Sequence, residues 1–80
     1  MNLKPLVTEK AVMLIETQNT LSFTTERIST RTEIKKEIED LFDVKVELVR
    51  TQIRNNKKYA YVKLKRQNPA MDVATKLGVI

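Results

Sequence analysis

The sequence contains no cysteine and no histidine. Without thiols the chain can form neither disulfides nor thiolate metal sites, and without imidazole it lacks the commonest general base and the commonest zinc ligand. Cysteine proteases, zinc fingers and histidine-dependent catalytic triads are therefore excluded. The single glycine, Gly78, also excludes a glycine-rich phosphate-binding loop. We expect no enzyme, no metal site and no cofactor.

Long apolar runs are missing as well. The longest, residues 11–15, is far shorter than the roughly 20 residues that span a bilayer. The N-terminus lacks the ordered basic, apolar and small-residue segments of a signal peptide, so we expect a cytoplasmic protein without membrane insertion. A chain of 80 residues is the size of one small domain with a thin core. We therefore expect a single domain across residues 1–80.

Acidic residues are also scarce in one part of the chain. The sequence has 15 lysines and arginines against 10 acids, a net charge of +5. Residues 33–49 contain six acids and three bases, whereas residues 50–66 contain seven bases and no acid. Such an excess of positive charge indicates a polyanionic partner, of which nucleic acid is the usual one. The alternative interpretation of such a run is a solvated face without a partner.

Three helices are predicted from capping residues and apolar spacing. Thr8 caps a first helix over residues 8–17, and Asn68-Pro69 begins a last helix that ends at Gly78. Between them, Thr30 or Thr32 caps the clearest helix. Its apolar positions recur at helical spacing and predict a core-facing stripe: Ile34, Ile38, Leu41 and Phe42.

Three strands are predicted from alternating, β-branched segments: residues 21–25, 44–53 and 59–65. Asn55-Asn56 is a turn signal, so the last two strands form a hairpin. The right-handed crossover rule makes the first two strands parallel, with the third between them and antiparallel to both. Met1–Pro5 could add a short edge strand. The expected fold is α+β: a small three- to four-stranded, mainly antiparallel sheet with helices packed on its faces.

Alternation divides the side chains of the last strand between two sides. Ala60, Val62 and Leu64 point toward the amphipathic helix. On the other side, aromatic rings alternate with ammonium groups, which predicts an RNA surface of stacking platforms and phosphate contacts: Tyr59, Tyr61, Lys63 and Lys65. The alternative for Tyr61 is packing under the first helix, with Val49 and Ile53 on the same side. Tyr59, nearer the turn, is expected to be exposed.

Residues 57–64 also resemble the conserved octamer of RNA-recognition-motif domains, with Lys58 in place of its glycine and Leu64 in place of its last aromatic. The helix-first order and the missing closing strand differ from that fold. A free-standing RNA-binding module of this kind is therefore the alternative function.

Several segments of the sequence, taken in their order and spacing, resemble a second protein family more closely. They are Pro-Leu-Val-Thr-Glu-Lys-Ala at 5–11, Thr-Glu-Ile-Lys-Lys-Glu-Ile-Glu at 32–39, Leu-Phe-Asp-Val-Lys-Val at 41–46, Thr51, and Ala-Tyr-Val-Lys-Leu at 60–64. In order and spacing these are similar to the universal large-subunit ribosomal protein family number twenty-three. The resemblance covers nearly the whole chain. It implies a small sheet with helices on both faces.

The resemblance also implies a function. The family binds large-subunit rRNA beside the exit of the nascent-peptide tunnel, among neighbouring large-subunit proteins. There it offers a docking surface to the signal recognition particle or to an exit-site chaperone. By position in the family motif, Glu9 is the candidate docking contact. Thr8 and Lys10 match the opening motif, Arg31 replaces a usual lysine, and Lys35 and Lys36 match the basic pair of the helix.

Together with the basic stretch, these positions make up the predicted RNA-binding set: Lys4, Thr8, Lys10, Arg31, Lys35, Lys36, Arg50, Thr51, Arg54, Asn55, Lys57, Lys58, Tyr59 and Lys63. Two of them depart from the family pattern, because Tyr59 interrupts the usual Lys-Lys-Ala and Arg50 stands where many members have asparagine. The bacterial branch has a long basic hairpin loop that enters the tunnel. Here a few residues join the strands, so none of the chain is expected to enter the tunnel. In this respect it resembles the archaeal form, or the core of the eukaryotic form without its basic N-terminal extension.

Three carboxylates, Glu33, Glu37 and Asp40, share one face of the long helix. Nearby lysines and the absence of histidine and cysteine favour a solvated, ion-paired helix face over a metal site.

Overall fold

A computed structural model describes residues 3–25 and 30–78 of the chain. Its elements are β1 (Lys4–Pro5), α1 (Glu9–Gln18), β2 (Thr20–Thr25), α2 (Arg31–Phe42), β3 (Val46–Arg54), β4 (Lys57–Leu64) and α3 (Ala70–Leu77). The four strands form one sheet in the order β1-β2-β4-β3, and all neighbours are antiparallel. The predicted α+β fold, the central position of β4 and the short edge strand near the N-terminus are confirmed.

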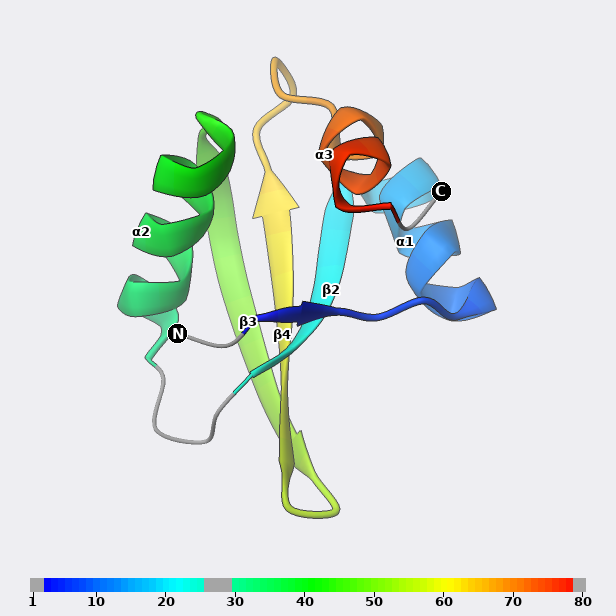
Figure 1. Ribbon diagram of the computed structural model, residues 1–80, viewed down its shortest axis with the longest axis vertical. Coiled ribbons are helices and arrows are strands. Elements are labelled where there is room, and N and C mark those ends of the chain that lie inside the picture. The colour runs from blue at the N-terminus through cyan, green and yellow to red at the C-terminus, as the bar shows by residue number, and fades with distance from the viewer. Residues whose placement is uncertain (1–2, 26–29, 79–80) are drawn as a thin grey trace.

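One side of the sheet is covered by helices and holds the core. Figure 1 shows α2 over β3 and α3 near the upper end of β2, and the core residues of both helices belong to one cluster with the strands. Ala60, Val62 and Leu64 of β4 are each at most 1% exposed, as their alternation predicted. Ile15 of α1 joins the same cluster. We call this side of the sheet the helix-covered face.

Helix α2 is capped by Thr30, not Thr32, because the Thr30 hydroxyl accepts a hydrogen bond from the Glu33 N–H at 3.2 Å. Ile34 and Ile38 are at most 1% exposed, but Leu41 is 63% exposed. The prediction that Leu41 belongs to the buried stripe is wrong. Ile34, Ile38 and Phe42 form a row spaced by four residues, and Leu41 is turned about 100° from Phe42, which directs it to solvent.

A β-bulge changes which side of the sheet the side chains of β3 project to. Its pairing with β4 shifts between Val46 and Leu48, so that Val46 and Val49, three residues apart, both lie in the core. Val49 pairs with Val62, and Ile53 pairs with Lys58. The expectation that Val49 and Ile53 share the side of Tyr61 is therefore wrong, because the extra residue of a bulge reverses the alternation that the sequence pattern assumes.

The hairpin between β3 and β4 closes through Asn55 and Asn56, whose φ angles are 51° and 63°. Two consecutive left-handed residues are the signature of a type I′ turn, and asparagine tolerates this conformation well. The predicted short connection is confirmed.

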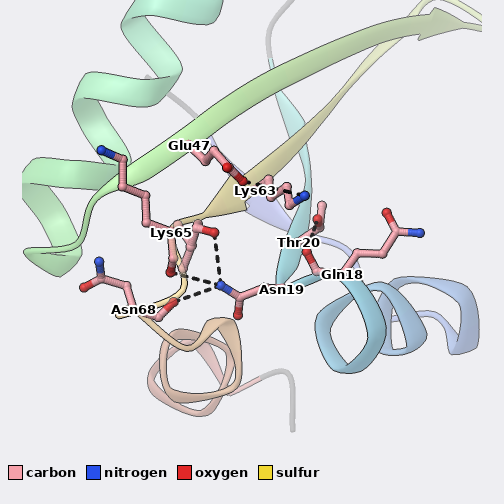
Figure 2. A network of polar contacts seen from close by, with 8 residues as sticks. Gln18, Asn19, Thr20, Glu47, Lys63, Lys65 and Asn68 are labelled. Atoms are coloured by element: carbon pink, nitrogen blue, oxygen red, sulfur yellow. Dashed lines mark hydrogen bonds and ion pairs between the residues drawn. The ribbon is translucent and has the colours of Figure 1, made fainter.

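A single asparagine joins three elements at the upper end of the sheet. Asn19 ends α1 in the left-handed conformation (φ 52°), and Figure 2 shows its side chain at the centre of a polar network. Asn19 Nδ2 lies 3.1–3.2 Å from the carbonyl oxygens of Leu64, Lys65 and Asn68. Its Oδ1 accepts a hydrogen bond from the Ala70 N–H at 2.6 Å. Asn19, rather than Asn68, therefore caps α3.

Within the described part of the chain, no helix has the length and apolar character needed to cross a membrane.

Candidate nucleic-acid interface

The side of the sheet opposite the helix-covered face carries the aromatic and basic side chains. Paired residues of antiparallel strands project to the same side, so the register defines this face. Ser22, Tyr61 and Arg50 form one row across three strands. The next row toward the hairpin contains Thr24, Tyr59 and Gln52, and Lys4 of β1 extends it. We call this side the open face.

Five cationic residues lie on the open face: Lys4, Arg50, Arg54, Lys57 and Lys63. One of them has an anionic partner, because Lys63 Nζ lies 3.6 Å from a carboxylate oxygen of Glu47, with the two side chains 44% and 50% exposed. Both are well solvated, so this pair contributes little to stability. The face therefore keeps a clear excess of positive charge.

Arg54 and the two tyrosines form a contact cluster near the hairpin. The Arg54 guanidinium carbon lies 5.0 Å from the centre of the Tyr59 ring, a cation–π arrangement. Its Nη2 also donates to the Tyr61 hydroxyl at 3.5 Å. Both rings are half-buried, so the expectation that Tyr59 is exposed is only partly met. The cluster fixes two flat, accessible rings on one basic surface.

A groove lies between α1 and the open face, with a volume of about 430 Å³. Its apolar lining consists of Leu14 from α1, Leu48 from β3 and Tyr61 from β4. Arg50, Lys63 and Gln18 supply polar groups. Tyr61 thus faces the first helix, as the packing alternative predicted, yet it also lines a hollow that is open to solvent.

The structure groups part of the predicted RNA-binding set on the open face: Lys4, Arg50, Arg54, Lys57, Tyr59 and Lys63. Asn55 is exposed in the adjoining turn. Thr51 differs, because it pairs with buried Ala60 and so belongs to the helix-covered side. By the same alternation Lys58 projects away from Lys57, and it is half-buried.

The remaining predicted residues lie on helices α1 and α2. Lys35 and Lys36 are exposed on α2, which covers the other side of the sheet, and Arg31 is the first residue of that helix. The three acids Glu33, Glu37 and Asp40 share α2 with them. In the described ranges, no three histidine, cysteine, aspartate or glutamate side chains come together as a metal site.

At the start of α1, the Thr8 hydroxyl accepts the Ala11 N–H at 3.1 Å and so acts as the helix cap. Glu9 and Lys10 follow in the first turn with exposed side chains. Glu9 therefore has no burial or capping role that would conflict with a contact to another molecule.

The sequence patterns did not identify Leu14, Gln18 and Leu48 as lining residues of the groove. Leu14 and Gln18 are spaced by four residues on α1 and line the same groove. That spacing was visible, but only the tertiary packing of α1 beside β2 shows which surface it faces. Leu48 was missed because the bulge near Glu47 turns it to the open side, where it is 36% exposed.

The family model described as "Ribosomal protein L23" matches residues 1–75. The chain belongs to the ribosomal protein L23 family. A protein of Methanothermobacter thermautotrophicus described as "Large ribosomal subunit protein uL23" is 46% identical over 78 residues, which cover 96% of this chain and 91% of the relative. One of the same description from Pyrobaculum aerophilum is 45% identical over 76 residues, 94% of each chain.

Family membership confirms the resemblance drawn from the sequence blocks. An L23 protein is a structural constituent of the large ribosomal subunit rather than an enzyme, and it resides in the ribosome in the cytoplasm. The matched regions cover 91% and 94% of these two relatives, so neither has a long segment that this chain lacks. This agrees with the short hairpin.

Proposed function

We propose that the chain binds large-subunit rRNA beside the exit of the peptide tunnel as a single rRNA-binding domain. The observation that supports this most directly is the gathering of five cationic residues and two tyrosines on the open face. Phosphate contacts by such residues provide most of the affinity for RNA, while exposed rings can stack on bases. Neighbouring large-subunit proteins complete its surroundings in the subunit.

The electrostatic part of this proposal has a measurable consequence. If the open face and the hairpin engage roughly 4–6 phosphates, counterion release gives a slope of log K against log salt of roughly −3 to −5. We expect this slope for the purified chain titrated with large-subunit rRNA. A slope near zero would refute the electrostatic contact.

Sedimentation distinguishes a ribosomal constituent from a free RNA-binding module. A tagged copy of the chain should sediment with large subunits and leave them only at high salt. The alternative module would remain in the soluble fraction at all salt concentrations. Membership in the L23 family supports the first outcome.

We further propose that Glu9 is a contact for the signal recognition particle or an exit-site chaperone. Glu9 is exposed in the first turn of α1, and on a basic protein surrounded by rRNA phosphate a carboxylate is a distinctive feature for a cationic partner. Ribosomes with Glu9→Lys should bind such a factor more weakly while the protein still assembles. Glu16→Lys, at an exposed position of the same helix, is the matched control and should leave factor binding unchanged.

A failure of the Glu9→Lys protein to assemble would instead assign Glu9 to the rRNA interface. Equal factor affinity for mutant and wild-type ribosomes would limit Glu9 to a favourable charge at a helix N-terminus, worth about 0.3–1 kcal/mol.

A further inference from the structure

The groove beside α1 differs in chemistry from the rest of the basic surface. Phosphate binding requires only charge, yet this hollow of about 430 Å³ has the apolar side chains of Leu14, Leu48 and Tyr61 in its lining. Its volume lies within the range of pockets that take small organic ligands. An apolar hollow in the middle of a cationic surface indicates a ligand that is flat and apolar in one part and anionic in another.

The polar groups of the groove match the remaining parts of such a ligand. Arg50 lies beside Tyr61 on the neighbouring strand, and the guanidinium of arginine suits phosphate geometry. Gln18 and Gln52 add amides that can both donate and accept hydrogen bonds. None of the described residues that line the groove is acidic, so nothing in the lining opposes a phosphate.

We propose that this groove holds an unpaired nucleotide of the large-subunit rRNA, with its base against Tyr61 and its phosphate toward Arg50. The inference rests on the rRNA binding proposed above and specifies which form of RNA the site takes. In an A-form duplex the faces of the bases are stacked on one another, so a recessed ring cannot reach them. Nucleotides in loops and bulges can be splayed out and stacked on aromatic side chains.

Arg54 supports this role by positioning the rings. Its guanidinium lies over Tyr59 at 5.0 Å and reaches the Tyr61 hydroxyl at 3.5 Å. The contact joins the hydroxyl of Tyr61 to the hairpin, and Tyr61 still lines the groove. Arg54 is therefore a positioning residue for Tyr61 in addition to a phosphate contact.

The composition of the chain provides a direct readout. It contains two tyrosines and no tryptophan, so the Tyr59→Phe variant has Tyr61 as its only strong fluorophore. The probe is a short single-stranded RNA that contains all four bases, compared with the same strand annealed to its complement. We expect the single strand to quench the Tyr61 emission at saturation, and the duplex to bind without comparable quenching. The Tyr61→Phe variant reports Tyr59 alone, and free tyrosine titrated with the same RNA corrects for light absorbed by the RNA.

Substitutions on α1 test the groove itself. Leu14→Glu adds a carboxylate to the lining of the groove. The control, Met13→Glu, adds the same charge at the preceding residue, which is 58% exposed. Loss of one stacked base should weaken single-strand binding by about tenfold or more for Leu14→Glu, while Met13→Glu should stay close to the wild type. If Leu14→Glu fails to fold, Gln18→Glu, a nearly isosteric change at an exposed lining residue, replaces it.

The possible results separate the two proposals. Quenching of Tyr61 by the single strand, with the selective effect of Leu14→Glu or Gln18→Glu, supports the nucleotide site. The nucleotide site is overturned if RNA binds without changing the Tyr61 emission and if the groove variant and Met13→Glu have equal affinities. The proposed rRNA binding would remain, and the groove would then suit a protein partner. Absence of binding to the short single strand overturns the nucleotide site, and absence of binding to large-subunit rRNA at low salt overturns both.

Discussion

Replacing Asn19 tests how far one amide holds this fold together. Asn19 Nδ2 approaches three carbonyl oxygens, but an amide nitrogen carries two hydrogens, so the three contacts share two donors. With the bond from Ala70 to Oδ1, the side chain provides the equivalent of three hydrogen bonds. At about 0.5–1.5 kcal/mol each, their loss should lower the free energy of unfolding by roughly 2–4 kcal/mol.

Three variants separate the contributions at this position. Asn19→Gly keeps the left-handed backbone without strain and removes only the side chain, so it measures the hydrogen bonds. Asn19→Ala adds a backbone penalty of about 1 kcal/mol. Asn19→Asp keeps an acceptor for the Ala70 N–H but directs a carboxylate at three carbonyl oxygens, so it should be no more stable than Asn19→Gly.

The assay is urea unfolding followed by circular dichroism, with the free energy compared at constant m-value. The expected order of stability is wild type, then Asn19→Gly, then Asn19→Ala. A free energy for Asn19→Gly within about 0.5 kcal/mol of the wild type, the usual range for surface substitutions, would refute the reasoning. The network in Figure 2 would then be a consequence of the fold without contributing to its stability.

Further predictions concern the core, one cap, the turn and the RNA surface. Ile38→Ala should lower the free energy of unfolding by about 2–4 kcal/mol in urea titrations, whereas Leu41→Ala, at a 63% exposed position of the same helix, should change it little. Thr30→Ala removes the cap of α2 and should cost about 1 kcal/mol in the same titration. Asn56→Val should destabilise the domain by about 1–2 kcal/mol, because a β-branched residue must adopt φ 63°. Lys57→Ala should weaken rRNA binding in filter assays and leave the melting temperature unchanged; normal binding with reduced stability would assign Lys57 a structural role.

Local patterns predicted much of the fold because they depend on contacts close in sequence. The alternation of β4 and the cap at Thr8 follow from backbone geometry that a few residues determine. The bulge in β3 and the long-range cap from Asn19 to Ala70, 51 residues away, depend on packing that no local window contains. They are the features that the sequence did not reveal.

The candidate site also has a part that the sequence predicted and a part that it did not. Charge counting and alternation identified the basic hairpin and Tyr59, because both are properties of consecutive residues. The groove was not predicted, since it needs Leu14 of α1, Leu48 of β3 and Tyr61 of β4 to meet. Only the tertiary arrangement, including the bulge that turns Leu48 outward, brings these three side chains to one place.

The bulge has a further consequence for the free protein before it enters a ribosome. In the strand order β1-β2-β4-β3, the nine-residue β3 is an edge strand, and no strand among the described residues pairs with its outer side. Straight, apolar edge strands invite pairing between copies and aggregation. Here the bulge distorts the edge near Glu47, and Arg50 and Arg54 would bring like charges together in a paired copy. A distorted, positively charged edge is less able to pair with a second copy than a straight, apolar one.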